Sequence, residues 1–240
     1  MPARRSRAPR AAPDRTRRFF LGLTGASGHP YALALARALL ERGHALDVSA
    51  TAAGLKVLRH ECGLDIALDG SDLGARLASA LGLEQGDPRL RVFDASAIEA
   101  PPSSGTALTG AVILCPCSMG SLARVSAGFS SNLVERAADV ALKEGRTLIL
   151  VVREAPYSAI HLENMLRMAR LGAVILPASP GFYHRPRTLE DLVRHVVGKV
   201  LDRAGVAHEV SARWSGFAAS GPAPEPPDEE GVEPRGRAGR

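Results

Sequence analysis

The stretch that most constrains the fold is residues 19–31, where an apolar run is followed by small residues and then by a helical pattern. Phe19 to Leu23 is long enough for one buried strand, Thr24 to Gly28 breaks it, and Pro30 suits the first turn of a helix over 31–40. A glycine loop at a helix N-terminus leaves backbone N–H groups free for an anion, usually phosphate. The spacing matches neither a dinucleotide fingerprint nor a nucleotide P-loop, so an ordinary tight turn that uses glycine for its φ angles remains the alternative.

The same alternation of strand and helix recurs along the chain. The pattern predicts further strands over 45–50, 89–94, 110–116, 147–152 and 173–176, and further helices over 55–60, 133–143, 160–171 and 188–204. The runs at 110–116 and 147–152 are almost wholly apolar, as in strands buried on both faces of a parallel sheet. The fold class is therefore α/β, a doubly wound parallel sheet. Residues 63–106 are broken by Gly, Asp and Pro and carry no clear pattern beyond the short strand.

In a sheet of this kind ligands bind beyond the carboxyl ends of the strands. The polar residues expected at that edge are Ser27, Thr51, Ser118, Glu154 and the loop that carries Tyr183. Thr51 either contacts a ligand or caps the helix that follows it, and capping is the commoner use of a threonine there.

Charge is distributed unevenly along the 240 residues. Residues 1–18 hold seven Arg and one Asp, residues 217–240 hold five acids and three Arg, and the part between them is close to neutral. We expect a disordered basic arm over 1–17, one folded domain over 18–214, in which Trp214 packs at the end, and a disordered Pro/Glu-rich tail over 215–240. The near-neutral domain argues against a nucleic-acid partner.

Cysteine content and hydropathy bear on the compartment. The three cysteines, Cys62, Cys115 and Cys117, have no disulfide or metal-site spacing, so we expect free thiols, no metal and a reducing, cytoplasmic environment. No apolar run reaches the about 20 residues of a membrane span, and the basic N-terminus lacks the apolar core of a secretory signal.

Two charged clusters carry possible chemistry. Arg153-Glu154 follows a predicted strand, and it is either a structural ion pair or a proton-transferring carboxylate beside a guanidinium. Arg136, Lys143, Arg153 and Lys199, with the phenol of Tyr183, are either solvated surface groups or a set of cations for an anionic leaving group.

Seven segments in register identify a family resemblance. They are Gly25–Gly28, Cys115–Ser121, Asn132–Lys143, Val152–Pro156, His161–Met165, Gly172–Pro177 and Gly181–Pro186. Together they resemble the UbiX/Pad family of flavin prenyltransferases over about residues 18–214. The resemblance implies a flavodoxin-like, Rossmann-like single domain and a homo-oligomer, typically a dodecamer.

The resemblance also implies an activity. The family transfers a dimethylallyl group from dimethylallyl monophosphate to N5 and then C6 of reduced FMN without a metal. The product, prenylated FMN, is the cofactor of UbiD-type decarboxylases, which would be the recipients of this chain's product.

Site roles carry over residue by residue from the resemblance. Flavin contacts are implied for Gly25, Ala26, Ser27, Thr51, Ser118, Met119, Gly120, Ser121 and Arg136. Prenyl phosphate contacts are implied for Arg136, Lys143, Arg153, Tyr183 and Lys199. Glu154 would be the acid/base group, with Ser27 and Lys143 assisting catalysis.

One departure and two alternatives accompany the resemblance. Ala107 aligns where many members carry Trp or Phe near the prenyl site, which leaves rate and substrate choice open. A flavin-dependent cysteine decarboxylase of the same fold would use a His after the glycine loop; His29 and His60 are present, but the segment Cys115–Met119 lacks the Asn of that family's Pro-x-Met-Asn motif. A flavin carrier without chemistry is the second alternative, and the presence of Glu154 and Lys143 argues against it.

Overall fold

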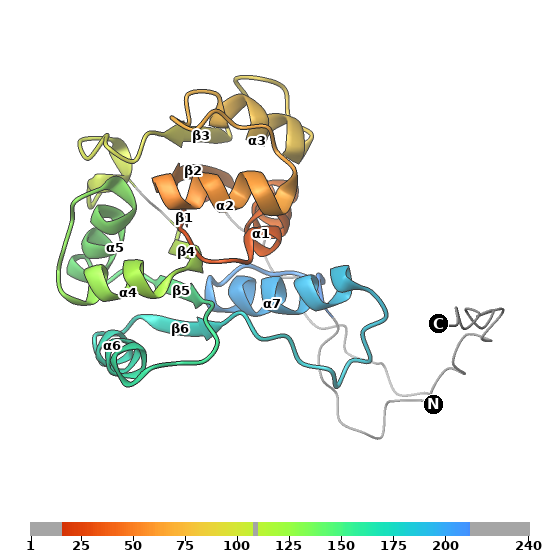
Figure 1. The fold of residues 1–240 in the computed structure, drawn as a ribbon. Helices are drawn as coiled ribbons and strands as arrows, with labels where there is room; N and C mark the ends of the chain where they lie inside the picture. Colours follow the sequence, from red (N-terminus) through yellow and green to blue (C-terminus); the bar gives the residue numbers. More distant parts are fainter. Residues whose placement is uncertain (1–15, 108–109, 212–240) are drawn as a thin grey trace, which may run out of the picture.

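The computed structural model describes residues 16–107 and 110–211 and contains one parallel sheet (Figure 1). Within these residues the strands are β1 (Arg18–Leu23), β2 (Ala45–Ala50), β3 (Leu90–Phe93), β4 (Val112–Cys117), β5 (Leu148–Val152) and β6 (Val174–Pro177). They are ordered β3-β2-β1-β4-β5-β6, and every neighbouring pair is parallel. The predicted doubly wound, flavodoxin-like sheet is confirmed.

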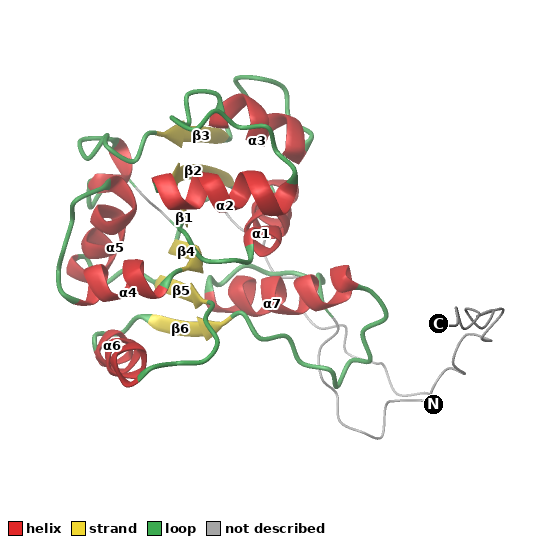
Figure 2. Ribbon diagram, in the orientation of Figure 1, coloured by secondary structure: helices red, strands yellow, loops and turns green. Residues whose placement is uncertain are grey.

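Helices connect the strands in the alternating order that the sequence indicates (Figure 2). They are α1 (His29–Glu41), α2 (Ala52–Cys62), α3 (Leu73–Leu81), α4 (Met119–Ser126), α5 (Leu133–Lys143), α6 (Ala159–Arg170) and α7 (Leu189–Arg203), with a short 3₁₀ turn over Pro101–Ser103. The prediction for α5 matches residue for residue. Helix α3 lies in the segment without a clear pattern and was not predicted.

The helices cover both faces of the sheet. On one face α1, α3 and α7 bury apolar side chains such as Leu35, Leu77 and Val197 against the sheet. On the other face α4, α5 and α6 do the same through residues such as Val134 and Met168. Helix α2 adds Leu55 and Leu58 to the first cluster. Because strands are covered on both sides, β1, β2, β4 and β5 are buried almost throughout.

The chain reverses its direction of travel across the sheet between β1 and β4. From β1 it moves outward through β2 to β3, then returns to add β4, β5 and β6 on the other side. At such a reversal the loops after the two central strands diverge and leave a crevice at their carboxyl ends. The loops after β1 and β4 are therefore the place to look for a site.

At the N-terminal boundary Arg17, which the sequence prediction assigns to the basic arm, contacts the folded part. Its guanidinium donates to the carbonyl oxygens of Ala204 (3.1 Å) and Gly205 (2.7 Å), just after α7, and it lies over the ring of Phe19. The rest of the arm before residue 16, Trp214 and the predicted tail lie outside the described residues. None of the helices in the described ranges is both long and apolar enough to cross a bilayer.

Candidate functional site

Thr24 joins the ends of the two central strands. Its hydroxyl donates to the carbonyl oxygen of Pro116 at 2.7 Å and accepts the backbone N–H of Ser118 at 2.8 Å. The side chain is completely buried. This bridge holds the loop after β1 against the end of β4 and the residue that follows it.

Ser27 lies in the loop after β1 and is held from two directions. The Arg153 guanidinium, just after β5, donates from Nε to the Ser27 carbonyl oxygen at 3.2 Å. On the other side the carboxylate of Glu61, at the end of α2, accepts hydrogen bonds from the backbone N–H groups of Gly28 (2.8 Å) and His29 (2.9 Å). Two predicted site residues, Ser27 and Arg153, are thus in direct contact.

The contact with Glu61 revises the expectation of an anion at the start of α1. The N–H groups of Gly28 and His29 are the donors that a phosphate would use there, and Glu61 already occupies them. Burial alone would raise the pKa of Glu61, but hydrogen bonds from Ser27, Gly28 and His29 outweigh it and lower that pKa. The glycine loop therefore binds a carboxylate of its own chain.

Thr51 caps α2, and the first turn of α2 lies against the end of β1. The Thr51 hydroxyl accepts the N–H of Gly54 at 3.1 Å, as the capping alternative predicted. A Cβ at Gly54 would lie 2.5 Å from the carbonyl oxygen of Leu23, so this glycine permits the close approach. Ala52 and Ala53 are exposed in this turn, and Ala53 lies against Gly25, where an added Cβ would be 2.7 Å from the Ala53 Cβ.

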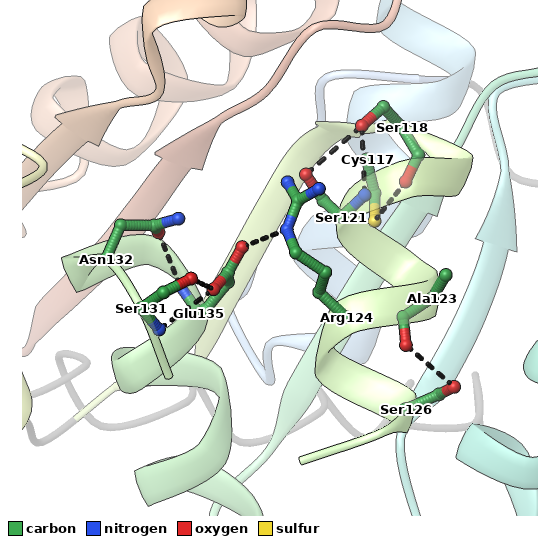
Figure 3. Close-up of polar contacts among 9 residues, drawn as sticks. All are labelled: Cys117, Ser118, Ser121, Ala123, Arg124, Ser126, Ser131, Asn132 and Glu135. Atoms are coloured by element: carbon green, nitrogen blue, oxygen red, sulfur yellow. Dashed lines mark hydrogen bonds and ion pairs between the residues drawn. The ribbon is translucent and has the colours of Figure 1, made fainter. Parts of the chain in front are cut away.

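The start of α4 presents small hydroxyl residues to the same edge (Figure 3). Ser118 caps the helix by accepting the N–H of Ser121 at 3.2 Å, and the two hydroxyls lie 3.1 Å apart. Met119 and Ser121 are buried, whereas Gly120 is exposed. Residues 118–121 thus follow β4 at the carboxyl edge of the sheet, where the Ser118 N–H bonds to Thr24 of the loop after β1.

An ion pair holds α4 against α5 below this wall (Figure 3). The Arg124 guanidinium donates to Glu135, whose other oxygen accepts from the backbone N–H (3.0 Å) and hydroxyl (2.6 Å) of Ser131. Burial would raise the pKa of Glu135, but these hydrogen bonds prevail and lower it. Arg136, the next residue, is in the first turns of α5 and pairs with Asp139 at 3.0 Å.

Arg153 and Glu154 do not form the ion pair that the sequence left open. Arg153 bonds to Ser27, and the Glu154 carboxylate accepts only the adjacent N–H of Ala155, at 3.0 Å, among the described contacts. Both side chains are half-buried at the carboxyl end of β5. The Glu154 carboxylate therefore has no cation as a partner among the described contacts.

Tyr183 and Lys199 belong to a second group, beside β6. The rings of His184 and His195 stack with centroids 4.9 Å apart, and Tyr183 packs edge-on against His195 at 5.4 Å. Burial, and then His184 and Lys199, lower the pKa of His195. Lys199 and His195 line a groove of about 750 Å³ between β6 and α7. The loop before this group starts next to Arg153, since the N–H of Ala178 bonds to the Val152 carbonyl.

Lys143 lies apart from the other predicted site residues. Helix α5 starts near the carboxyl edge, where the N–H of Leu133 bonds to Ala95 after β3, and runs back toward the start of β5. Ten residues of helix span about 15 Å, so Lys143 is at the amino edge of the sheet, where it pairs with Glu144 at 3.1 Å. Ala107, in the loop that leads to β4, lies toward the same edge.

The remaining candidate residues are in surroundings that indicate a structural role. His29 is completely buried, with Nε2 3.1 Å from the carbonyl oxygen of Thr24, so it does not contact a substrate as the decarboxylase alternative requires. The three cysteines are free thiols, as predicted, and burial raises the pKa of Cys62 to about 11 and of Cys117 to about 12. Within residues 16–107 and 110–211 no group of three metal-binding side chains occurs.

The arrangement defines a class of protein: an α/β protein whose polar loop residues meet at the point where the strand order reverses. The flavoprotein family model matches residues 7–201. Flavin prenyltransferase UbiX of Pseudomonas aeruginosa is 44% identical over 197 residues, which is 82% of this chain and 93% of the relative. The chain belongs to the flavoprotein family and, within it, to the flavin prenyltransferases of the UbiX type.

Two solved structures share the fold and have more than 30% sequence identity with this chain. The crystal structure of AnUbiX in complex with FMN and dimethylallyl pyrophosphate has a TM-score of 0.73 and 33% identity, covering 85% of this chain and 100% of that one. A dodecameric FMN-dependent UbiX-like decarboxylase from Escherichia coli has a TM-score of 0.71 and 37% identity, covering 83% and 100%. The family resemblance read from the sequence is confirmed.

Sequence reasoning missed Thr24, Glu61 and the stacked pair His184 and His195. Thr24 and Glu61 act through contacts to residues 92 and 33 positions away, and no local motif signals such a contact. The Gly181–Pro186 motif contains His184, but its stacking on His195 requires the tertiary placement of α7.

Proposed function

We propose that this chain is a flavin prenyltransferase that moves a dimethylallyl group from dimethylallyl monophosphate to N5 and then C6 of reduced FMN. The observation that carries the proposal is the direct contact of Ser27 with Arg153, beside Glu154, at the switch point of a chain in this family. The product, prenylated FMN, would serve a UbiD-type decarboxylase, and we expect a cytoplasmic enzyme because its cysteines are free.

The crevice residues fit FMN by the chemistry of their donors. Thr51 and the first turn of α2 provide a hydroxyl and a positive helix end for the phosphate or the ribityl chain, a role that the start of α1 does not fill because Glu61 occupies it. Gly25, Ala26 and Ser27 would form one wall of the flavin site. Ser118 to Ser121 would form the other wall, and Arg136 would contact a phosphate. When bound, reduced FMN supplies the nucleophile for the transfer.

The donor phosphate requires cations because charge accumulates on it as the C–O bond breaks. Arg153, Tyr183 and Lys199 are the residues of this chain that we assign to it, since the loop with Tyr183 starts beside Arg153. Cations already held in place stabilise the leaving phosphate without reorganisation. Glu154 would take up and return the proton that ring closure displaces, with Ser27 nearby to orient the acceptor.

Lys143 can serve this site only from another copy of the chain, given its position at the amino edge. We therefore propose a homo-oligomer, with a dodecamer as in the E. coli relative, in which α5 of one subunit reaches the crevice of another. The exposed apolar side chains of α6, namely Ile160, Leu162 and Leu166, support contact between copies.

The test is an anaerobic reaction of the purified protein with FMN, dithionite and dimethylallyl monophosphate, followed by delivery of the flavin fraction to a UbiD-type apo-decarboxylase. We expect the decarboxylase to become active with that fraction and to stay inactive when the donor is omitted. The same result with dimethylallyl pyrophosphate but not the monophosphate would change the proposed donor. No activation with either donor would contradict the proposal.

A further inference from the structure

The loop between β6 and α7 carries Tyr183, whose side chain is exposed. At the start of the loop, the N–H of Ala178 donates to the Val152 carbonyl oxygen at 2.9 Å. At its end, the N–H of Arg187 donates to the carboxylate of Asp191 in the first turn of α7, also at 2.9 Å. The position of the Tyr183 phenol therefore depends on what holds the middle of this loop.

Two ring contacts join the middle of the loop to α7. The ring of His184 lies parallel to that of His195, with 3° between their planes and 4.9 Å between their centroids. Tyr183 meets His195 edge-on, with centroids 5.4 Å apart. A Cβ at Gly181 would lie 3.1 Å from the Tyr183 ring and 3.5 Å from Nε2 of His195, so this glycine leaves room for both rings. His195 is thus the residue of α7 on which Tyr183 and His184 both pack.

Packing, rather than hydrogen bonding, holds His184 on α7. Both of its ring nitrogens are buried, and neither has a hydrogen-bond partner among the described residues. Burial, and then His184 and Lys199, lower the pKa of His195. Its ring is therefore neutral near pH 7 and does not repel the neighbouring imidazole. A stack of the two rings is then favourable.

His195 also lies beside the cation that we assign to the donor phosphate. Lys199 follows four residues later on α7, so the two side chains leave the same face of the helix. Both residues line the groove of about 750 Å³ beside β6. The phenol of Tyr183 and the ammonium group of Lys199 are both hydrogen-bond donors that suit phosphate oxygens.

We propose that His195 is a positioning residue that holds the loop with Tyr183 against α7, so that the phenol and the Lys199 ammonium group bind the phosphate of the prenyl donor together. The inference rests on the proposed function, which assigns Tyr183 and Lys199 to that phosphate. Loss of the His195 ring should weaken binding of the donor. Binding of FMN should not change, because its proposed contacts lie in the loops after β1, β2 and β4 and on α5.

Two substitutions separate the ring of His195 from the volume of its side chain. His195→Leu keeps a side chain of similar size but removes the ring, whereas His195→Phe keeps a ring that can stack on His184. Val200→Ala, at a buried position further along α7, controls for a general loss of stability.

The measurement is the dissociation constant of dimethylallyl monophosphate in the presence of oxidised FMN, together with that of FMN itself. The proposed transfer needs reduced FMN, so the donor binds without turnover. We expect His195→Leu to bind the donor roughly two- to tenfold more weakly, the effect of one aromatic contact. His195→Phe and Val200→Ala should stay close to the wild type, and all variants should bind FMN equally.

A double-mutant cycle tests whether His195 acts through Tyr183. In a Tyr183→Phe background, His195→Leu should have little further effect on donor affinity, since the phenol is gone. A loss of equal size in both backgrounds would overturn the proposal, because His195 would then act on the donor without Tyr183.

Two further outcomes would also overturn the proposal: unchanged donor affinity in His195→Leu, or an equal loss in His195→Leu and His195→Phe. These dissociation constants do not depend on turnover. If the wild type bound the donor but made no prenylated flavin, the proposed function would fail while the inference on His195 would stand on its own result.

Discussion

Several carboxylates hold this molecule together through two or three donors each. Asp47, fully buried on β2, bonds to Arg18 (2.8 Å) and Arg91 (2.7 Å) across neighbouring strands. Glu135 bonds to Arg124 and Ser131, and Glu61 bonds to the glycine loop. Burying a carboxylate costs free energy of folding unless its oxygens accept hydrogen bonds or form ion pairs. Each of these carboxylates therefore fixes the positions of the residues that bond to it.

The ion pair of Glu135 with Arg124 predicts what happens to stability when Arg124 is removed. Arg124→Ala leaves the carboxylate without its cation, and we expect a loss of about 1.5 kcal/mol, the low end for hydrogen bonds to charged groups because Arg124 is half exposed. Thermal denaturation should show a melting temperature lower by about 3–6 °C. Exposed Lys56→Ala is the control, and equal melting temperatures for the two variants would contradict the role of the pair.

The lowered pKa values of Glu61 and Glu135 predict a pH dependence of stability. Each group binds a proton more weakly in the folded than in the unfolded chain, so its contribution is present above the unfolded value, about 4.3, and is lost as the pH falls through the lower folded value. We expect the melting temperature to fall steeply in this acidic range. In Glu135→Gln the fall should be shallower, and an identical slope would show that Glu135 does not contribute.

At the scale of elements, helix starts and strand ends place the polar groups. Thr51, Ser118, Asn132, Ser158 and Thr188 each cap the helix that follows. Thr188 forms a capping box with Asp191 at the start of α7. Thr51 and Ser118 instead cap helices that start at the carboxyl edge of the sheet. Under the proposed function, both stability and ligand binding depend on these two side chains.

This difference predicts distinct outcomes for two equivalent substitutions. Thr51→Ala and Thr188→Ala each remove one cap and should each lower the free energy of unfolding by about 1 kcal/mol. Only Thr51→Ala should also weaken FMN binding, which isothermal titration measures. Equal FMN affinity in both variants would remove Thr51 from the flavin site.

Elements with a strong local pattern are the ones that the sequence predicts well. Helix α5 has apolar residues at helical spacing and an Asn before it, and β4 and β5 are continuous apolar runs, so their positions were predictable. Helix α3 is preceded by the glycine-broken stretch 63–72 and escaped prediction. In the site, motif residues such as Ser27 and Arg153 were foreseen, whereas their contact with each other and with Glu61 depends on how the sheet is wound.

For the whole molecule, the main consequence of the topology is that one chain does not bring all proposed site residues together. Ser27, Arg153 and Glu154 follow β1 and β5 at the carboxyl edge of the sheet, whereas Lys143 is the last residue of α5, toward the amino edge. Under the proposed function, Lys143 reaches the substrate phosphate from a neighbouring subunit. Assembly and catalysis are then coupled.

Subunit mixing tests this coupling. Lys143→Ala and Glu154→Gln should each be nearly inactive alone, since a lost contact to a charged group costs roughly 10- to 100-fold in rate. Mixed oligomers, made by dissociation and reassembly, should regain activity, because some crevices then have an intact Glu154 from one subunit and an intact Lys143 from another. No recovery in verified mixed oligomers would place both residues in the same chain's site.

The most direct measurement of the central claim is the mass of the flavin after reaction, with wild type and Glu154→Gln side by side. Both proteins are incubated anaerobically with reduced FMN and dimethylallyl monophosphate, and the mass of the extracted flavin is measured by mass spectrometry. The account predicts a gain of one C₅H₈ unit with the wild type, and little or no completed product with Glu154→Gln although it binds FMN normally. Unmodified FMN from the wild type, or full conversion by Glu154→Gln, would contradict it.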